Sequence, residues 1–389
     1  MKKIVRAQEY LKEHHLDGWL LYDFNHNNPL ALDFLEVAQE AHLSRRLFYW
    51  LPVIGEPIKI VHRIEPYTLD HLPGKKRTYH TYQQLKDALH TSLQGAEKVA
   101  MEYSPQNALP YVSKVDAGTV DMVRECGVSV VSSGMFLQQF TAVLTKQEQD
   151  MQREAGKLLD QIASETFLFL SQRLKQGFST DEYMLQQWVM QCFQEKGLVT
   201  EYAPICAFGV HTADPHYSPS EHRSAKLQPN ELILLDFVAR KKQGVYGDIT
   251  RMGFSGSHLP EKYAKMFSIA RKAQDLGFEL VKERHAKNQV IKGYEVDGVC
   301  RDFITKEGYG EYFVHRTGHN IDTRSVHGSG AHLDGFETYD DRPLIPGLCF
   351  TIEPGIYFPG EWGIRVEYDV LIHDGVEITS GVQESITTL

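Results

Sequence analysis

The chain has 389 residues, 42% of them apolar and 24% charged, so it can form two or three globular domains without a disulfide framework. Its 41 Lys and Arg against 51 Asp and Glu give a net charge of −10, which disfavours nucleic acid as a partner. We find no apolar run of membrane-spanning length, no signal-peptide pattern and no C-x-x-C pair among five cysteines. We therefore expect a cytoplasmic protein with neither nucleic-acid nor membrane partners.

The first 145 residues have the pattern of a small α/β domain. Short apolar runs, typical of strands, alternate there with helix-like stretches such as 82–93. The predicted strands cover 18–22, 47–53, 98–103 and 127–131. We place a boundary near residue 145, which divides the chain into domains 1–145 and 146–389.

The second part opens with two predicted helices. Residues 146–174 place apolar side chains at helical spacing, and Ser179 with Glu182 has the S-x-x-E spacing of a capping box before the next helix. Strand-like runs follow at 232–238, 245–249, 348–353 and 364–372, interrupted by one helical stretch at 261–284. Because helices and strands do not alternate regularly, we predict an α+β domain rather than a doubly wound sheet.

Two aspartates lie inside apolar strands, where an unpaired carboxylate is costly to bury. Asp236 follows four aliphatic residues, and Asp248 comes after a polar turn, so the two side chains can face each other across an antiparallel hairpin. The alternative is that each pairs with Arg251 or caps a turn.

The C-terminal region carries more charged residues in strand patterns. Strand alternation places Thr351 and Glu353 on one face, and in IRVEYDVLI the residues Arg365, Glu367 and Asp369 alternate with apolar ones. A half-solvated edge strand would give the same pattern in this second run.

Histidines cluster at His315, His319 and His327. Gly318 and the absence of a nearby glutamate indicate a loop or strand rather than a zinc-binding helix, although a chain with 18 histidines also forms clusters by chance. Two Asp, two Glu and one His together suit a pair of divalent ions such as manganese, cobalt or iron. Zinc is a further candidate, although the chain lacks a thiolate site.

These residues resemble the metallopeptidase family of the pita-bread fold, which includes methionine aminopeptidase, prolidase and Xaa-Pro aminopeptidase. The resemblance rests on five ordered blocks: ADPHYSP, LLDFVARKKQGVYGDITR, HRTGHNIDTRSVH, TIEPGIY and IRVEYDVLI. It covers 146–389 and implies a pita-bread catalytic domain with a curved antiparallel sheet. Residues 1–145 are similar to the small N-terminal domain of the prolidase and creatinase branch, which favours that branch.

The resemblance also implies an activity, Xaa-Pro aminopeptidase or Xaa-Pro dipeptidase, in which a hydroxide bridging two metal ions attacks the scissile carbonyl. The implied metal ligands are Asp236, Asp248, His319, Glu353 and Glu367, with manganese the foremost metal. Glu353 would also be the general base, His216 and His327 would hold the substrate, and His315 and Arg365 would support the site. Short proline-containing peptides are the implied substrates and a homodimer the implied assembly.

Departures from the family pattern leave other functions open. The spacings from Asp236 to Asp248 and from His319 to His327 are each one residue longer than usual, and Val238 stands where glycine is common. One alternative is a catalytically inactive, peptide-binding pseudopeptidase. The other is a creatinase-like amidinohydrolase, which works without metals. Retention of all five ligand positions disfavours both.

Overall fold

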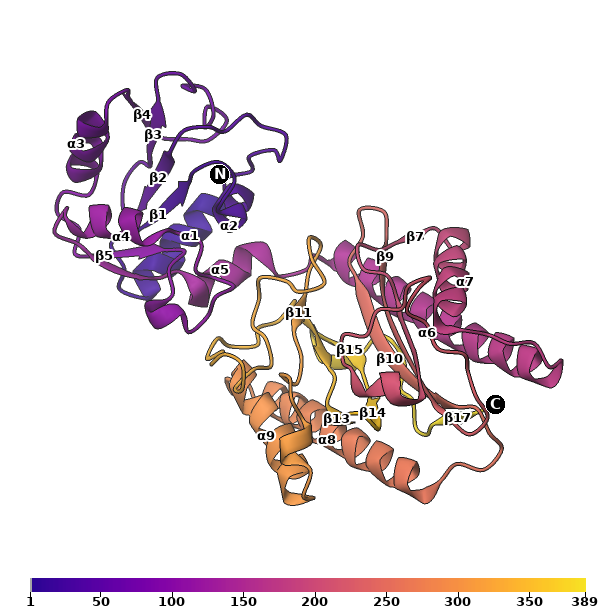
Figure 1. Ribbon diagram of the computed structural model, residues 1–389. Helices are drawn as coiled ribbons and strands as arrows, with labels where there is room; N and C mark the ends of the chain where they lie inside the picture. The colour runs from indigo at the N-terminus through magenta and orange to yellow at the C-terminus, as the bar shows by residue number, and fades with distance from the viewer. Residues whose placement is uncertain (1) are drawn as a thin grey trace. The chain divides into compact units, whose positions relative to one another are not determined.

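The computed structural model describes residues 2–389 and divides into two compact units, Met1–Thr141 and Ala142–Leu389 (Figure 1). The second unit begins slightly before the expected boundary because Leu144 N donates a hydrogen bond to Gly347 O at 2.9 Å, and Ala142 joins an apolar cluster with Leu348. Assignment of the first unit as a creatinase-like or prolidase-like domain stays a prediction.

The first unit is a mixed sheet with the strand order β4-β3-β2-β1-β5-β6. Its strands are β1 (Gly18–Asp23), β2 (Leu47–Pro52), β3 (Ile58–His62), β4 (Lys75–Tyr79), β5 (Lys98–Met101) and β6 (Ser129–Ser132). Its helices are α1 (Lys2–Glu13), α2 (Pro29–Phe34), α3 (Tyr82–Ser92), α4 (Ala117–Arg124) and α5 (Gly134–Thr141), with a 3-10 turn at Pro105–Asn107. Strand β1 is apolar on both faces because Trp19 packs with α1 while Leu20 packs with α3.

The second unit has an α+β architecture, as predicted. Its helices are α6 (Lys146–Lys175), α7 (Glu182–Glu195), α8 (Glu261–Ala286) and α9 (Gly293–Lys306), with 3-10 turns at Gly209–Ala213 and Gly310–Tyr312. Its strands are β7 (Leu198–Val199), β8 (Ile205–Phe208), β9 (Leu232–Lys241), β10 (Gly247–Phe254), β11 (Asn320–Ile321), β12 (Cys349–Ile352), β13 (Gly355–Phe358), β14 (Trp362–Arg365), β15 (Tyr368–Ile372), β16 (Val376–Ile378) and β17 (Thr387–Thr388).

Three groups of strands form the sheets of this unit. They have the orders β17-β10-β9-β7 with β8 also paired to β9, β11-β12-β15-β16, and β13-β14. Helix α6 packs against β9 and β10, whereas α8 packs against β12, β13 and β14, so helices cover the strands (Figure 1).

Strand β9 shows how the sequence builds the framework of the site. Every second residue, including Ile233, Leu235 and Phe237, packs in the apolar cluster beneath α6 and α7. The residues between them face the other way, and among these Asp236 and Val238 are partly exposed. The two-residue period therefore gives β9 one apolar face and one face that carries polar groups.

One local prediction was wrong, and one alternative is excluded. Helix α7 is capped by Asp181, whose side chain accepts a hydrogen bond from Met184 N at 2.8 Å, so Ser179 and Glu182 do not form a capping box. The run IRVEYDVLI is not an edge strand, because it divides into β14 and β15, and β15 lies between β12 and β16 with all its residues buried. Two of its polar residues, Arg365 and Glu367, line a cavity, and Asp369 is fully buried beside them.

Among residues 2–389 we find no helix that is both long and apolar enough to cross a membrane.

Close packing of α6 on β10 depends on Gly247. A Cβ atom there would lie 2.8 Å from Gly156 N and 3.0 Å from the carbonyl carbon of Ala155. We expect Gly247→Ala to lower the free energy of unfolding by about 1–3 kcal/mol, as overpacking of a core does. The matched control is Gly298→Ala in α9, where no atom lies within 4 Å of the added Cβ. Thermal unfolding of both variants measures this, and equal unfolding midpoints would contradict the prediction.

Candidate metal centre

A cavity of about 560 Å³ in the second unit brings the predicted site residues together. Its lining includes all nine of them: His216, Asp236, Asp248, His315, His319, Glu353, Arg365, Glu367 and His327. They come from strands and loops far apart in the sequence. Their convergence on one cavity is what a shared chemical role requires.

The hairpin of β9 and β10 supplies both aspartates. Asp236 pairs in register with Thr250 and Asp248 with Val238, so the two carboxylates are diagonal neighbours on the same face. The longer spacing between them is accommodated in the turn, where Gly244 N bonds to Lys241 O at 2.8 Å and Gln243 has a φ of 64°. The extra residue therefore leaves the ladder intact.

A histidine and two glutamates complete the cluster. Nε2 of His319 lies 3.4 Å from Asp248 Oδ2 and 3.4 Å from Glu353 Oε1. One ligand atom from each of Asp248, His319 and Glu367 can be chosen so that all three lie within 4.8 Å of one another. These three residues form a nitrogen and oxygen donor set that can hold a cation, with Glu353 beside it.

Glycine at position 318 lets the His319 segment approach β12 closely. A Cβ atom at Gly318 would lie 2.0 Å from the carbonyl oxygen of Thr351. The same threonine accepts a hydrogen bond from His319 N at 3.0 Å and donates one from Oγ1 to Glu353 Oε1 at 3.0 Å. Thr351 thus fixes a histidine and a glutamate relative to each other.

The orientation of the His319 ring fits a metal ligand. Its Nδ1 faces the carbonyl oxygen of Asn320 at 3.4 Å, and because a carbonyl only accepts, the proton belongs on Nδ1. The lone pair of Nε2 then points at two carboxylate oxygens. Three electron-rich atoms at these distances repel one another unless a proton or a cation lies between them.

Burial raises the pKa values of the carboxylic acids in this cavity. Desolvation is the largest cause for Asp248 and Glu367, whose pKa values lie well above the usual range, and neighbouring carboxylates raise them further. Desolvation also raises the pKa of Glu353 to about 7. Divalent cations would offset this repulsion and keep the acids ionised, and an oxygen-rich set with one imidazole suits manganese, iron or cobalt.

Asp236 is held by Arg365 rather than by Arg251. The Arg365 guanidinium donates to Asp236 Oδ2, and its Nε donates to Thr250 Oγ1 at 2.9 Å. The Thr250 hydroxyl in turn donates a hydrogen bond to Glu367 Oε2 at 2.6 Å. Arg251 Nε instead donates to Asp160 at 2.9 Å, so the alternative pairing of the aspartates with Arg251 is wrong.

His315 supports the site as a neutral ring. Its Nδ1 donates to the carbonyl oxygen of Arg316 at 2.7 Å, so its Nε2 accepts from the Tyr357 hydroxyl at 2.9 Å. Arg365 donates to the same hydroxyl oxygen at 3.1 Å. Burial, followed by the charge of Arg365, lowers the pKa of His315 to about 3.

His216 and His327 lie at the exposed rim of the cavity. The His327 ring is 4.5 Å from that of His319, nearly perpendicular to it, and desolvation of the ring by the cavity wall lowers the pKa of His327 to about 4. The segment that carries His216 is anchored by buried Glu182, which accepts from Phe208 N at 2.7 Å and from the Tyr217 hydroxyl at 2.6 Å. Rim histidines in such positions can contact a bound substrate.

Several functional neighbours escaped the sequence analysis. Thr250 and Tyr357 are neutral residues, and nothing in their sequence context distinguishes them from other strand residues. Strand alternation placed Thr351 on the same face as Glu353, but it did not identify the hydrogen bond between them. Asp369 belongs to the recognised polar run, yet its role was not identified. Its Oδ2 accepts from Asp248 N at 3.1 Å and from Gln152 Nε2 at 2.8 Å, which fixes the strand that carries Asp248.

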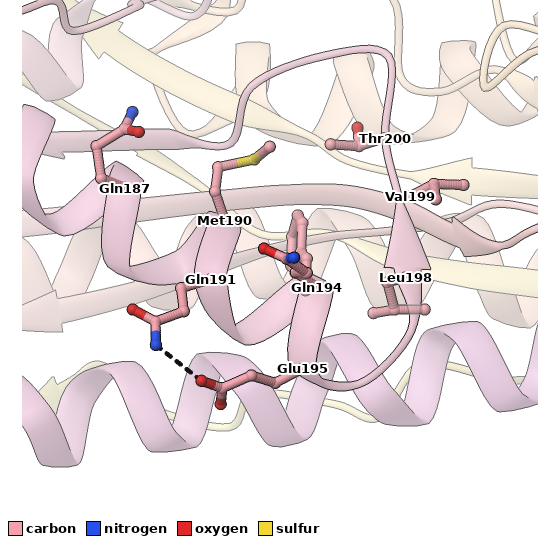
Figure 2. Close-up of a pocket in the computed structure, with 9 residues that line it drawn as sticks. Gln187, Met190, Gln191, Gln194, Glu195, Leu198, Val199 and Thr200 are labelled. Carbon is pink, nitrogen blue, oxygen red and sulfur yellow. Dashed lines mark hydrogen bonds between the residues drawn. The ribbon is translucent and has the colours of Figure 1, made fainter.

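A second hollow of about 930 Å³ lies beside α7 and β7 (Figure 2). Among its nine lining residues the one carboxylate is Glu195, which accepts a hydrogen bond from Gln191 Nε2 at 2.8 Å. The lining holds no histidine or cysteine beside this single carboxylate, so it has no cluster of metal-binding groups.

Comparison with known proteins places the cavity in context. The model of the family described as metallopeptidase family M24 matches residues 150–374. A Xaa-Pro dipeptidase of Lactobacillus helveticus is 37% identical over 174 residues, which cover 44% of this chain and 43% of that relative. The matched segment thus spans less than half the length of the curated relative.

Solved structures resemble the whole chain. Dipeptidase PepE from Mycobacterium ulcerans has a TM-score of 0.71 at 24% identity and covers 100% of this chain and 97% of its own. An X-prolyl aminopeptidase from Caenorhabditis elegans, described as a cytosolic enzyme with a di-nuclear active site, has a TM-score of 0.63 at 19% identity. It covers 99% of this chain and 61% of its own. These likenesses confirm the predicted fold.

The low pKa of His315 leads to a prediction about its charge. Because that pKa is about 3, the folded ring stays neutral from pH 8 to pH 5, whereas an unfolded histidine titrates near 6.5. His315 therefore contributes stability that is complete above about pH 6.5 and falls as the pH drops toward 3. NMR of ¹⁵N-labelled histidine should show an unchanging Nδ1–H tautomer, with His315→Asn identifying the signal. A ring that titrates near pH 6 would refute this.

Proposed function

The chain belongs to metallopeptidase family M24, and from this premise we propose that it is a dinuclear metal-dependent exopeptidase that hydrolyses Xaa-Pro bonds at the N-termini of short peptides. The observation that carries the proposal is the cluster of Asp248, His319 and Glu367, with Glu353 beside it in one cavity. The dipeptidase and aminopeptidase relatives support this class of substrate.

The metal centre would be held by Asp236, Asp248, His319, Glu353 and Glu367. Two divalent cations, when bound, supply polarisation of a carbonyl oxygen and a water of lowered pKa. Four carboxylates balance the charge of such a pair. Manganese is our first candidate for these oxygen-rich ligands, ahead of cobalt, iron and zinc.

Glu353 is our candidate for the proton carrier. Hydrolysis needs a group that takes a proton from the attacking water and delivers it to the proline nitrogen as the C–N bond breaks. Glu353 lines the cavity, and its Oε1 accepts a hydrogen bond from the Thr351 hydroxyl at 3.0 Å and lies 3.4 Å from Nε2 of His319.

The rim histidines would hold the substrate. With a pKa of about 4, His327 is neutral at pH 7 and can donate an N–H hydrogen bond to the carbonyl oxygen as negative charge develops there. His216 lies on the same cavity from a different segment. His315 and Arg365 act behind them, because they hold Tyr357 and Asp236 in place.

A homodimer and a cytoplasmic location stay predictions. The subtype, dipeptidase or aminopeptidase, depends on how much room a peptide finds beyond proline, and the assay below distinguishes the two. A catalytically inactive pseudopeptidase and a creatinase-like amidinohydrolase are disfavoured because the whole donor set is present.

The first test is hydrolysis of an X-Pro dipeptide, an X-Pro-Y tripeptide and a Met-Ala-Y control peptide with added manganese. We expect cleavage of the proline substrates, loss of cleavage with chelator, and a fall in kcat of at least about 100-fold in Glu353→Gln, because general-base catalysis supplies that factor. The control is Glu361→Gln in the exposed turn between β13 and β14. The dipeptide-to-tripeptide ratio identifies the subtype, and absence of all cleavage would overturn the proposal.

Metal binding has its own test, independent of activity. We expect the purified chain to bind two manganese ions, and Asp248→Asn to lose at least one, because Asp248 lies within 4.8 Å of two other donors. Elemental analysis after dialysis measures the stoichiometry. Asp160→Asn, which changes a carboxylate that bonds Arg251 outside the cavity, should keep both ions. Equal metal content in the three proteins would contradict the assigned ligands.

A further inference from the structure

One apolar side chain lies among the candidate metal ligands. Val238 is two residues after Asp236 on β9, so both side chains lie on the same face, and it pairs in register with Asp248 on β10. The Cβ atoms of directly opposed residues in an antiparallel pair are about 4.5–5.5 Å apart. Val238 therefore occupies the first layer of side chains around the centre and lines the cavity.

The position of Val238 is fixed by packing. One side of it contacts the apolar cluster that contains Val326 and Tyr246, and the other side is partly exposed in the cavity. A β-branched side chain has little freedom at χ1. The two methyl groups of Val238 thus form a rigid part of the cavity wall, next to Tyr202 and Val326, which also line it.

The geometry of an Xaa-Pro substrate brings its first side chain to such a wall. The α-carbon of Xaa is bonded directly to the scissile carbonyl carbon, which must approach Asp248, His319 and Glu353 to react. The side chain of Xaa starts one bond further on, so it must find space among the residues that surround the centre. Because proline is the same in every substrate, the size of the Xaa side chain is what this wall can discriminate.

Building on the proposed function, we propose that Val238 limits the size of the side chain before proline, so that the enzyme prefers small first residues such as glycine and alanine. A bulky Xaa would overlap the methyl groups of Val238. Removing both methyl groups opens space beside Asp248 without altering a ligand. Val238 acts on specificity alone, because it carries no group that can bind metal or transfer a proton.

The experiment compares kcat/KM for Gly-Pro, Ala-Pro, Leu-Pro and Phe-Pro with manganese. We expect the native enzyme to prefer Ala-Pro over Phe-Pro, and Val238→Ala to raise the Phe-Pro to Ala-Pro ratio by about tenfold or more, because hydrophobic pockets discriminate by such factors for each group of methylene size. Val238→Ile, which adds one methylene, should lower the ratio. The matched control is Val376→Ala, another half-buried valine on a strand, outside the cavity lining.

The outcomes separate this inference from the proposed function. An unchanged ratio in Val238→Ala and Val238→Ile, or a native preference for Phe-Pro, overturns the size limit while hydrolysis itself still supports the peptidase. A change of equal factor for all four substrates also overturns it, because Val238 would then contact proline or the backbone. Failure of the native chain to cleave any of them overturns the proposed function first. Circular dichroism confirms that each variant is folded.

Discussion

Four carboxylates and the imidazole of His319 cluster in one cavity, and their mutual repulsion is the constraint that the surrounding side chains must offset. Desolvation drives Asp248 and Glu367 toward the protonated form, and neighbouring carboxylates raise the pKa values of both further. The surrounding side chains offset the repulsion between the carboxylates in two ways. Arg365 brings positive charge to Asp236, and hydroxyl groups of Thr250 and Thr351 donate to the glutamates. The remaining negative potential is what attracts cations to the centre.

The strands and loops that carry these residues are brought together by close approach of their backbones at two glycines. Gly318 lets the His319 segment pack against the carbonyl oxygen of Thr351, and Gly247 lets β10 pack against α6. Neither contact leaves room for a Cβ atom. The hairpin of β9 and β10 is therefore supported from behind by a helix, and rigid support is what metal ligands and a specificity wall both need.

The charged members of the site could be predicted from the sequence because a carboxylate inside an apolar strand is costly to bury without a partner. Asp236 and Asp248 stood out as carboxylates inside apolar strands, and the hairpin spacing brought them to one face. Strand alternation also disfavours Arg251 as the partner of Asp248. It lies three residues after Asp248, an odd number, and therefore faces the opposite side of β10, toward Asp160. Arg365 could be connected to Asp236 only in three dimensions, since 129 positions separate them.

The neutral members and the environment of the strands could not be predicted in this way. Thr250 and Tyr357 carry no desolvation signal, and their partners are remote in the sequence. The alternating run that contains Glu367 was ambiguous because a two-residue period is the same whether the polar face meets water or a buried cavity. Helix α9 was missed altogether, and the capping residue of α7 was misplaced by two positions, because local capping signals overlap at Ser179 and Asp181.

The burial of Glu182 has a consequence for how a peptide enters. Glu182 is the first residue of α7, and its carboxylate accepts hydrogen bonds from Phe208 N, the Tyr217 hydroxyl and Ala225 N. These bonds attach the His216 segment to the helical layer. A rim attached in this way is preorganised instead of closing over its ligand. Under the proposed function, the conformational entropy lost on binding then falls mainly on the peptide, and a proline peptide loses less because its backbone is already restricted.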